Sequence, residues 1–213
     1  DTLILDIAMG TNPTLIVVPP PRSEIPVFPA AQLSEGFQGG AGLSQLDLPL
    51  PATIRVRVTG YPYCDTARPY TVATLDFKQY AKHVLPNEWV ANWPWESVRA
   101  GAMAVKMYAW SYIAVGGKWS DADVYDSTCD QVYNPAYSYA STNKAVDDTW
   151  NWRLTRGTQL LRTFYRAYYS QCQAARLQGN CMGQVETREM AYDLFTWDEI
   201  LLSFYDNGVL SPI

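Results

Sequence analysis

The sequence predicts an α+β fold, built as a single domain that follows an extended N-terminal arm. The chain has 213 residues, of which 48% are hydrophobic and 17% charged, so it can bury a core and is not a disordered protein. Segments that alternate like strands occur both before and after segments with helical periodicity, which is typical of α+β proteins. Eight of the fourteen prolines and a glycine-rich stretch fall within residues 1–52, before the first regular alternation.

Residues 1–52 are expected to form the arm, and residues 53–213 the domain. Short apolar strands are predicted at 2–8 and 14–18, and three consecutive prolines end the second one. The simpler interpretation is that the arm wraps over its own domain. The alternative is self-association, in which an apolar strand of the arm adds to a neighbouring molecule.

The first half of the domain predicts two strands and two helices. Residues 53–59 alternate regularly, with Ile54, Val56 and Val58 facing inward, and a second strand is expected at 70–75. Asp76 is expected to cap a helix that carries apolar residues at helical spacing and that Pro86 stops.

A longer helix is expected to begin with Pro94 in its first turn and to end at the glycine pair 116–117. Its predicted buried stripe is Val98, Gly101, Ala102, Val105, Ala109 and Tyr112. The small residues at 100–104 predict close packing against another element.

The second half is expected to contain a loop at 118–141, a helix near 142–151, strands within 153–169 and a polar loop at 172–181. A helix near 183–192 follows. Thr196 and Glu199 have the spacing of a capping box, which predicts a last helix running to about Tyr205.

Charge and histidine content exclude several classes of protein. Lys and Arg total 16 against 21 Asp and Glu, which argues against a nucleic-acid binder. No apolar run reaches the roughly 18 residues of a spanning helix, so no membrane span is expected. His83 is the only histidine, which rules out a multi-histidine metal site and limits a Ser-His-Asp triad to that residue.

The four cysteines predict two disulfides and therefore an oxidising compartment. They contain no C-x-x-C pair, so the spacing of a zinc knuckle is absent. Closing the loop between Cys172 and Cys181 is easy, which would leave Cys64 with Cys129, but the sequence does not decide among the three possible pairings. Since the sequence begins at Asp1, we expect a secreted, processed protein in the extracellular space or cell envelope.

Several motifs in one order resemble the SpoIID/LytB domain of bacterial sporulation and cell-wall lytic proteins. Residues 75–89 read LDFKQYAKHVLPNEW and residues 93–109 read WPWESVRAGAMAVKMYA. Residues 126–133, DSTCDQVY, are similar to the family's D-x-T-x-x-Q-V-Y, and residues 142–149 read TNKAVDDT. Met182-Gly-Gln and Trp197-Asp-Glu-Ile-Leu are similar to the family's closing motifs. The resemblance covers roughly residues 53–206.

The resemblance implies a lytic transglycosylase that acts on peptidoglycan glycan strands and leaves 1,6-anhydro-muramic acid ends. It assigns the catalytic acid to Glu88, which three tryptophans follow closely in the sequence. Aromatic, partly dry surroundings raise the pKa of a carboxyl group and keep it protonated. By the same analogy, substrate contacts are expected from Trp93, Lys106, Tyr108, Gln131 and Tyr133, although aromatic residues at helical spacing are more often part of a core.

Some positions depart from the family pattern. The family's late Gly-Gly loop is replaced by residues 169–176, YSQCQAAR, and Val185 and Glu186 stand where Trp-Gly usually follows M-G-Q. Some members bind zinc through Cys and His, but no histidine lies near these cysteines, so neither a metal nor another cofactor is expected.

Two other functions compete with the transglycosylase. One is a non-catalytic extracellular structural or filament subunit of the same fold, assembled through residues 1–52. The other is a plain hydrolase that uses Glu88 with Asp126 or Glu96 and leaves a reducing end.

Overall fold

The computed structural model describes residues 45–213, which lie within one compact unit, Gly40–Ile213. The other unit, Asp1–Gly39, lies outside the described residues, together with the strands predicted at 2–8 and 14–18. Of the predicted arm, the structure describes residues 45–52, where Gln45–Asp47 form a short 3-10 helix, η2. The arm's boundary at residue 52 and its role in self-association stay predictions.

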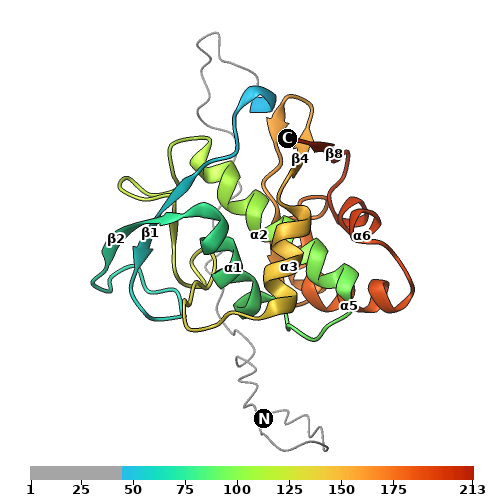
Figure 1. Cartoon of the computed structure of the whole chain (residues 1–213), viewed down its shortest axis with the longest axis horizontal. Coiled ribbons are helices and arrows are strands. Elements are labelled where there is room, and N and C mark those ends of the chain that lie inside the picture. The colour runs from blue at the N-terminus through green and yellow to red at the C-terminus, as the bar shows by residue number, and fades with distance from the viewer. Residues whose placement is uncertain (1–44) are drawn as a thin grey trace, which may run out of the picture. The chain divides into compact units, whose positions relative to one another are not determined.

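The first sheet has the strand order β2-β1-β3 and confirms the alternation seen in the sequence (Figure 1). Strand β1 (Thr53–Val58) pairs antiparallel with β2 (Thr71–Asp76) and parallel with β3 (Val124–Tyr125). Ile54 and Val56 are fully buried, and Val58 is half-buried. Strand β3 was not predicted, because its two residues lie inside a long polar segment and owe their extended conformation to pairing with β1.

Helix α1 (Phe77–Glu88) begins as predicted but ends later. The Asp76 side chain caps it by accepting a hydrogen bond from the Gln79 amide at 2.8 Å. The prediction that Pro86 stops the helix was wrong, because Pro86 lies inside it. The turn continues because the Trp89 amide donates to the Leu85 carbonyl at 2.8 Å and the Trp89 ring is buried.

Helix α2 (Trp95–Ile113) is buried on nearly all sides (Figure 1). From Ser97 to Tyr112, every residue except Arg99 is buried, so the predicted stripe was too narrow. Helices α1, α3, α5 and α6 all contact α2, as do strands of the second half of the domain. The helix ends at Ile113, shortly before the predicted glycine pair, and Gly116 and Gly117 have the positive φ angles of 91° and 114° that glycine tolerates.

The second half surrounds α2 with short elements. Helix α3 (Ala140–Thr149) precedes a sheet of the order β5-β4-β8, formed by Gln159–Leu160, Trp152–Arg156 and Val209–Pro212. Strand β6 (Phe164–Arg166) pairs in parallel with β7 (Cys181–Gly183). Helices α4 (Tyr169–Ala174), α5 (Gln184–Tyr192) and α6 (Trp197–Phe204) complete the domain.

These elements confirm the α+β class, the helices near 142–151 and 183–192 and the capping box of α6. The polar loop expected at 172–181 is partly wrong, because α4 extends into its beginning and β7 begins at its end. Strands β7 and β8 were not predicted.

Two disulfides cross-link the domain. One joins Cys64 to Cys129, 65 residues apart, and the other joins Cys172 to Cys181, nine residues apart. Of the three pairings that the sequence left open, the structure contains the one in which Cys172 and Cys181 close the short loop.

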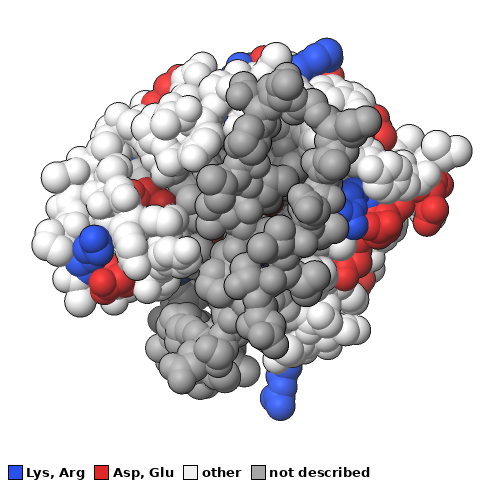
Figure 2. Space-filling model, turned by 90° about the horizontal axis from the view of Figure 1, so that it is seen from below, with Lys and Arg blue, Asp and Glu red and all other residues white. Residues whose placement is uncertain are grey.

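Within residues 45–213, none of the helices combines the length and the apolar character needed to cross a membrane. On the face drawn in Figure 2, acidic and basic side chains lie close to each other at several places along the margins.

Candidate active site

Glu88 lies in the last turn of α1, and its side chain is half-buried. The helix would place Glu88 beyond its end if Pro86 stopped it, as the sequence predicted. Because the helix instead continues to Glu88, the carboxylate lies on a regular helical turn that buried Trp89 anchors to the core.

Two segments distant in sequence donate hydrogen bonds to Glu88. The backbone amide of Val132 donates to Glu88 Oε1 at 2.8 Å. The side-chain amide of Gln184, the first residue of α5, donates to the Glu88 carbonyl at 2.8 Å and lies 3.4 Å from Oε2. The carboxylate is therefore oriented from both sides.

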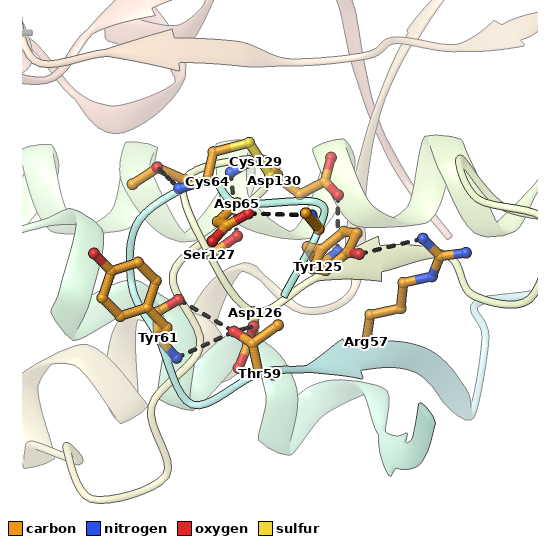
Figure 3. Close-up of a disulfide and its surroundings, with 12 residues drawn as sticks. Arg57, Thr59, Tyr61, Cys64, Asp65, Tyr125, Asp126, Ser127, Cys129 and Asp130 are labelled. Carbon is orange, nitrogen blue, oxygen red and sulfur yellow. Dashed lines mark hydrogen bonds between the residues drawn. A yellow bond between two sulfur atoms is a disulfide. The ribbon is translucent and has the colours of Figure 1, made fainter. Parts of the chain in front are cut away.

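The segment that supplies Val132, residues 126–133, is held by two carboxylates. Asp126 is buried and accepts hydrogen bonds from the Thr59 amide, the Thr59 hydroxyl and the Gly60 amide, each at 2.8 Å (Figure 3). The side chain of Asp130 is 0% exposed and accepts from groups on α2, on β3 and in the loop between them. Its donors are the Tyr108 hydroxyl, the Trp119 indole, the Tyr125 amide and the Lys118 ammonium.

Gln131 lies fully buried between two tyrosines. Its carbonyl oxygen accepts from the Tyr80 hydroxyl at 3.2 Å, and its amide donates to the Tyr165 hydroxyl at 3.0 Å and to the Val105 carbonyl. Burial raises the pKa of Tyr80 and Tyr165 well above the ordinary value for tyrosine, and the charge of Glu88 contributes to both shifts. Burial thus favours the neutral form of both phenols, and their hydrogen bonds to Gln131 fix the segment beside Glu88.

Tyr133 and Trp93 have partly exposed rings. Tyr133 stacks on Tyr80 with ring centroids 5.4 Å apart, and His83 meets it edge-on at 6.0 Å. The guanidinium of Arg188 lies 5.4 Å from the centre of the Trp93 ring. The structure thus connects Tyr133 to the Glu88 network and places Trp93 next to α5.

Tyr108 and Lys106 are buried on α2. The Tyr108 hydroxyl donates to Asp130 at 2.8 Å, so it supports the segment that holds Glu88. The Lys106 ammonium donates to the carbonyls of Thr149, Trp150 and Trp152, between the end of α3 and the start of β4. Burial lowers the pKa of Lys106. Direct contact of either side chain with substrate stays a prediction.

The two carboxylates considered for a hydrolase have structural partners. Glu96 faces Arg99 and accepts from the Trp197 amide at 2.8 Å, whereas Asp126 holds Thr59 and Gly60. Within residues 45–213, no group of three or more His, Cys, Asp or Glu is arranged to hold a metal ion.

Sequence reasoning proposed Glu88, Gln131 and Tyr133 as site residues but missed the groups that hold them. Gln184 belongs to the Met182-Gly-Gln motif, but sequence reasoning assigned it no role, although its side chain donates to Glu88. Val132 contributes only a backbone amide, for which its side chain gives no signal. Asp130 could have been suspected from its place in the DSTCDQVY motif.

Comparison with known families confirms the resemblance on which Glu88 was assigned. Residues 66–155 match the family described as "SpoIID: Stage II sporulation protein". This range includes Glu88, Lys106, Tyr108 and the whole 126–133 segment, whereas Gln184 lies outside it. The match indicates a cell-wall-related function associated with peptidoglycan.

A similar protein is an uncharacterized protein of Brachyspira hyodysenteriae. The two chains are 28% identical over 131 residues, which is 62% of this chain. The matched part is 32% of the relative, so this chain spans about a third of that protein's length.

Proposed function

We propose, from the SpoIID match over residues 66–155, that this domain is a lytic transglycosylase of peptidoglycan with Glu88 as its single acid and base. Its substrate is the glycan strand, which it cleaves to leave 1,6-anhydro-muramic acid ends. Because peptidoglycan lies outside the cytoplasm, the proposal includes an extracellular or cell-envelope location, with which the two disulfides agree.

The observation that carries the proposal is the way in which the Glu88 carboxylate is held. The Val132 amide and the Gln184 side chain approach it from two segments, each belonging to a motif shared with the family. A structural glutamate at a helix end does not need two such donors, whereas an acid–base residue needs a fixed orientation toward its substrate.

The surroundings of Glu88 suit a group that both gives and takes a proton. Its place in the last turn of α1 puts it near the negative end of the helix dipole, which favours the neutral acid. The donors Val132 and Gln184 favour the carboxylate that remains after the proton has left.

In the proposed reaction, Glu88 protonates the glycosidic oxygen that follows N-acetylmuramic acid, and the bond to C1 breaks. The Glu88 carboxylate then accepts the proton of the C6 hydroxyl, whose oxygen attacks C1 and closes the anhydro ring. No water is consumed, so a second carboxylate is not required. Glu96 and Asp126 both accept hydrogen bonds from groups of the protein itself, which agrees with a reaction that uses one carboxylate.

The test is mass spectrometry of peptide-free glycan strands incubated with the protein and with Glu88→Gln. We expect fragments with 1,6-anhydro ends, and a rate about 10²–10⁴-fold lower for the variant, the range typical of a lost acid–base group. Glu189→Gln is the matched control, because Glu189 is an exposed carboxylate whose side chain pairs with its neighbour Arg188.

Other products would contradict the proposal. Reducing ends would indicate a hydrolase. If neither protein cleaves the strands while circular dichroism shows a folded domain, the same fold acts as a binding or structural subunit. Size-exclusion chromatography with and without residues 1–52 would then test assembly through the arm.

A further inference from the structure

The Cys64–Cys129 disulfide joins the loop after β1 to the segment that holds Glu88 (Figure 3). Cys129 lies three residues before Val132, whose amide donates to Glu88. Cys64 is exposed and Cys129 is half-buried, so a thiol in solution can reach the bond. The second disulfide differs, because Cys172 and Cys181 are both 0% exposed.

Hydrogen bonds around the disulfide converge on the same segment. The Cys64 amide donates to the Thr128 hydroxyl at 2.8 Å, and the Thr128 amide donates to the Pro62 carbonyl at 2.9 Å. Both bonds involve loop residues whose positions the disulfide also constrains. The loop after β1 therefore fixes residues 128 and 129 as one unit.

The constraint continues along the segment to the carboxylate. Asp130 follows Cys129 directly and gathers four donors, and Gln131 is bonded to Tyr80 and Tyr165. The Val132 amide comes next, 2.8 Å from Glu88 Oε1. Only two residues, Asp130 and Gln131, separate Cys129 from Val132, so the disulfide and these hydrogen bonds together fix the position of the Val132 amide.

We propose that the Cys64–Cys129 disulfide is a positioning element for Glu88 that an external dithiol can release. The proposal rests on the function proposed above. A thiolate of the dithiol attacks the Cys64 sulfur, forming a mixed disulfide as Cys129 leaves as a thiolate. The second thiol then displaces the Cys64 thiolate, so the protein disulfide gains the two electrons that the dithiol loses. Reoxidation reverses the change.

The test combines dithiothreitol with hydrogen exchange and kinetics on the full chain. After mild reduction, alkylation and mass spectrometry should label Cys64 and Cys129 before Cys172 and Cys181. We expect the Val132 amide to exchange at least about tenfold faster, while amides of α2 keep their protection. On glycan strands, kcat should fall while KM stays nearly constant, and reoxidation should restore both the protection and kcat.

The matched control is the double variant Cys64→Ser/Cys129→Ser. It should reproduce the reduced protein, and dithiothreitol should change neither its exchange nor its kcat. An unchanged Val132 amide and unchanged kcat after reduction would overturn the proposal. So would loss of protection in α2 as well, because the disulfide would then support the whole fold. Faster exchange at Val132 in a protein without any glycan cleavage would contradict the transglycosylase and leave the positioning role intact.

Discussion

Gly101 on α2 lies against the indole ring of Trp89, the residue that follows Glu88. A Cβ atom added at Gly101 would lie 2.4 Å from Cδ2 of Trp89, far inside van der Waals contact. The Trp89 ring is also bonded through its indole nitrogen to the Thr187 hydroxyl at 3.2 Å. The ring therefore cannot move away without losing a buried hydrogen bond, and the small residue is what allows α1 and α2 to approach.

Gly101→Ala should destabilise the domain by about 1–3 kcal/mol, since overpacking forces side chains and backbone to shift. Although alanine is the better helix former, the gain of up to about 1 kcal/mol is smaller than this cost. Urea denaturation measures the free energy of unfolding. In a Trp89→Leu background the same substitution should cost much less, because the clash is gone. Equal costs in both backgrounds would mean that the ring is not what excludes alanine.

Helix α3 ends at a buried lysine contributed by another helix. The Lys106 ammonium donates to the carbonyls of Thr149, Trp150 and Trp152, which join the end of α3 to the start of β4. Carbonyls at a helix C-terminus have no partner within the helix, and a cation is favoured there. Lys106 thus performs for α3 the role that a C-cap glycine often performs elsewhere.

Lys106→Met should cost about 3 kcal/mol, because it keeps the apolar stem but leaves three carbonyls without their donor. Lys106→Arg keeps a charged donor and should cost about 1 kcal/mol, from the larger head group. Thermal and urea unfolding measure both variants, and circular dichroism reports the helix content. If methionine were tolerated as well as arginine, the three hydrogen bonds would not be what stabilises this junction.

A second link between helices depends on pH. Asp147 on α3 pairs with Lys78 and Lys82 on α1. Burial alone would raise the pKa of Asp147, but hydrogen bonds and charges from the two lysines outweigh it and hold the pKa below its ordinary value. The carboxylate is therefore favoured in the folded state, and its contribution is present above the unfolded pKa of about 3.9 and lost as the pH falls through the folded value.

Asp147→Asn should lower the free energy of unfolding at pH 7 by about 0.5 kcal/mol, because the pair is partly exposed. The difference from wild type should shrink as the pH falls below the unfolded pKa of about 3.9, and vanish below the folded pKa. Urea denaturation at several pH values measures it. Asp148→Asn is the control, since Asp148 pairs with Lys144 within α3 and does not link two helices. A difference that persisted in acid would show that charge is not its cause.

Local signals predicted the elements that depend on local chemistry. The cap at Asp76, the alternation of β1 and the capping box at Thr196 each concern residues a few positions apart, and all three were found. Strand β8 was missed because its pairing partner β4 lies more than fifty residues earlier. Proline usually ends a helix, which is why the sequence predicted that α1 stops at Pro86. The helix continues past Pro86 because the buried ring of Trp89 anchors its last turn to the core.

The same division separates the parts of the candidate site. The motif around Glu88 pointed to the carboxylate, but its partner Gln184 is 96 residues away and only the fold brings the two together. Lys106 was expected, by analogy with the family, to contact the substrate, and its three carbonyl partners become visible only once α3 and β4 are in place. Spacing identifies reactive groups, whereas packing decides what surrounds them.

The whole domain buries several tyrosine hydroxyls in its core. Tyr80, Tyr108, Tyr165 and Tyr205 lie at or below 7% exposure, and each donates or accepts a hydrogen bond inside the protein. Burial raises the pKa of all four well above the ordinary value, and nearby carboxylates add to the shift for the three tyrosines around Asp130 and Glu88. The folded state thus favours the neutral phenols.

Alkaline pH should therefore unfold the domain cooperatively. Because these pKa values are higher in the folded than in the unfolded chain, the stabilisation is complete below about pH 10 and is lost as the pH rises further. After a jump to strongly alkaline pH, the tyrosinate absorbance of Tyr80, Tyr108, Tyr165 and Tyr205 should appear slowly, together with the loss of near-ultraviolet circular dichroism. Tyr205→Phe should reduce this slow amplitude by about one residue, because the Tyr205 hydroxyl donates to the Phe164 carbonyl at 2.8 Å and lies outside the Glu88 network. Immediate ionisation of every tyrosine, with the circular dichroism intact, would show that burial does not protect them.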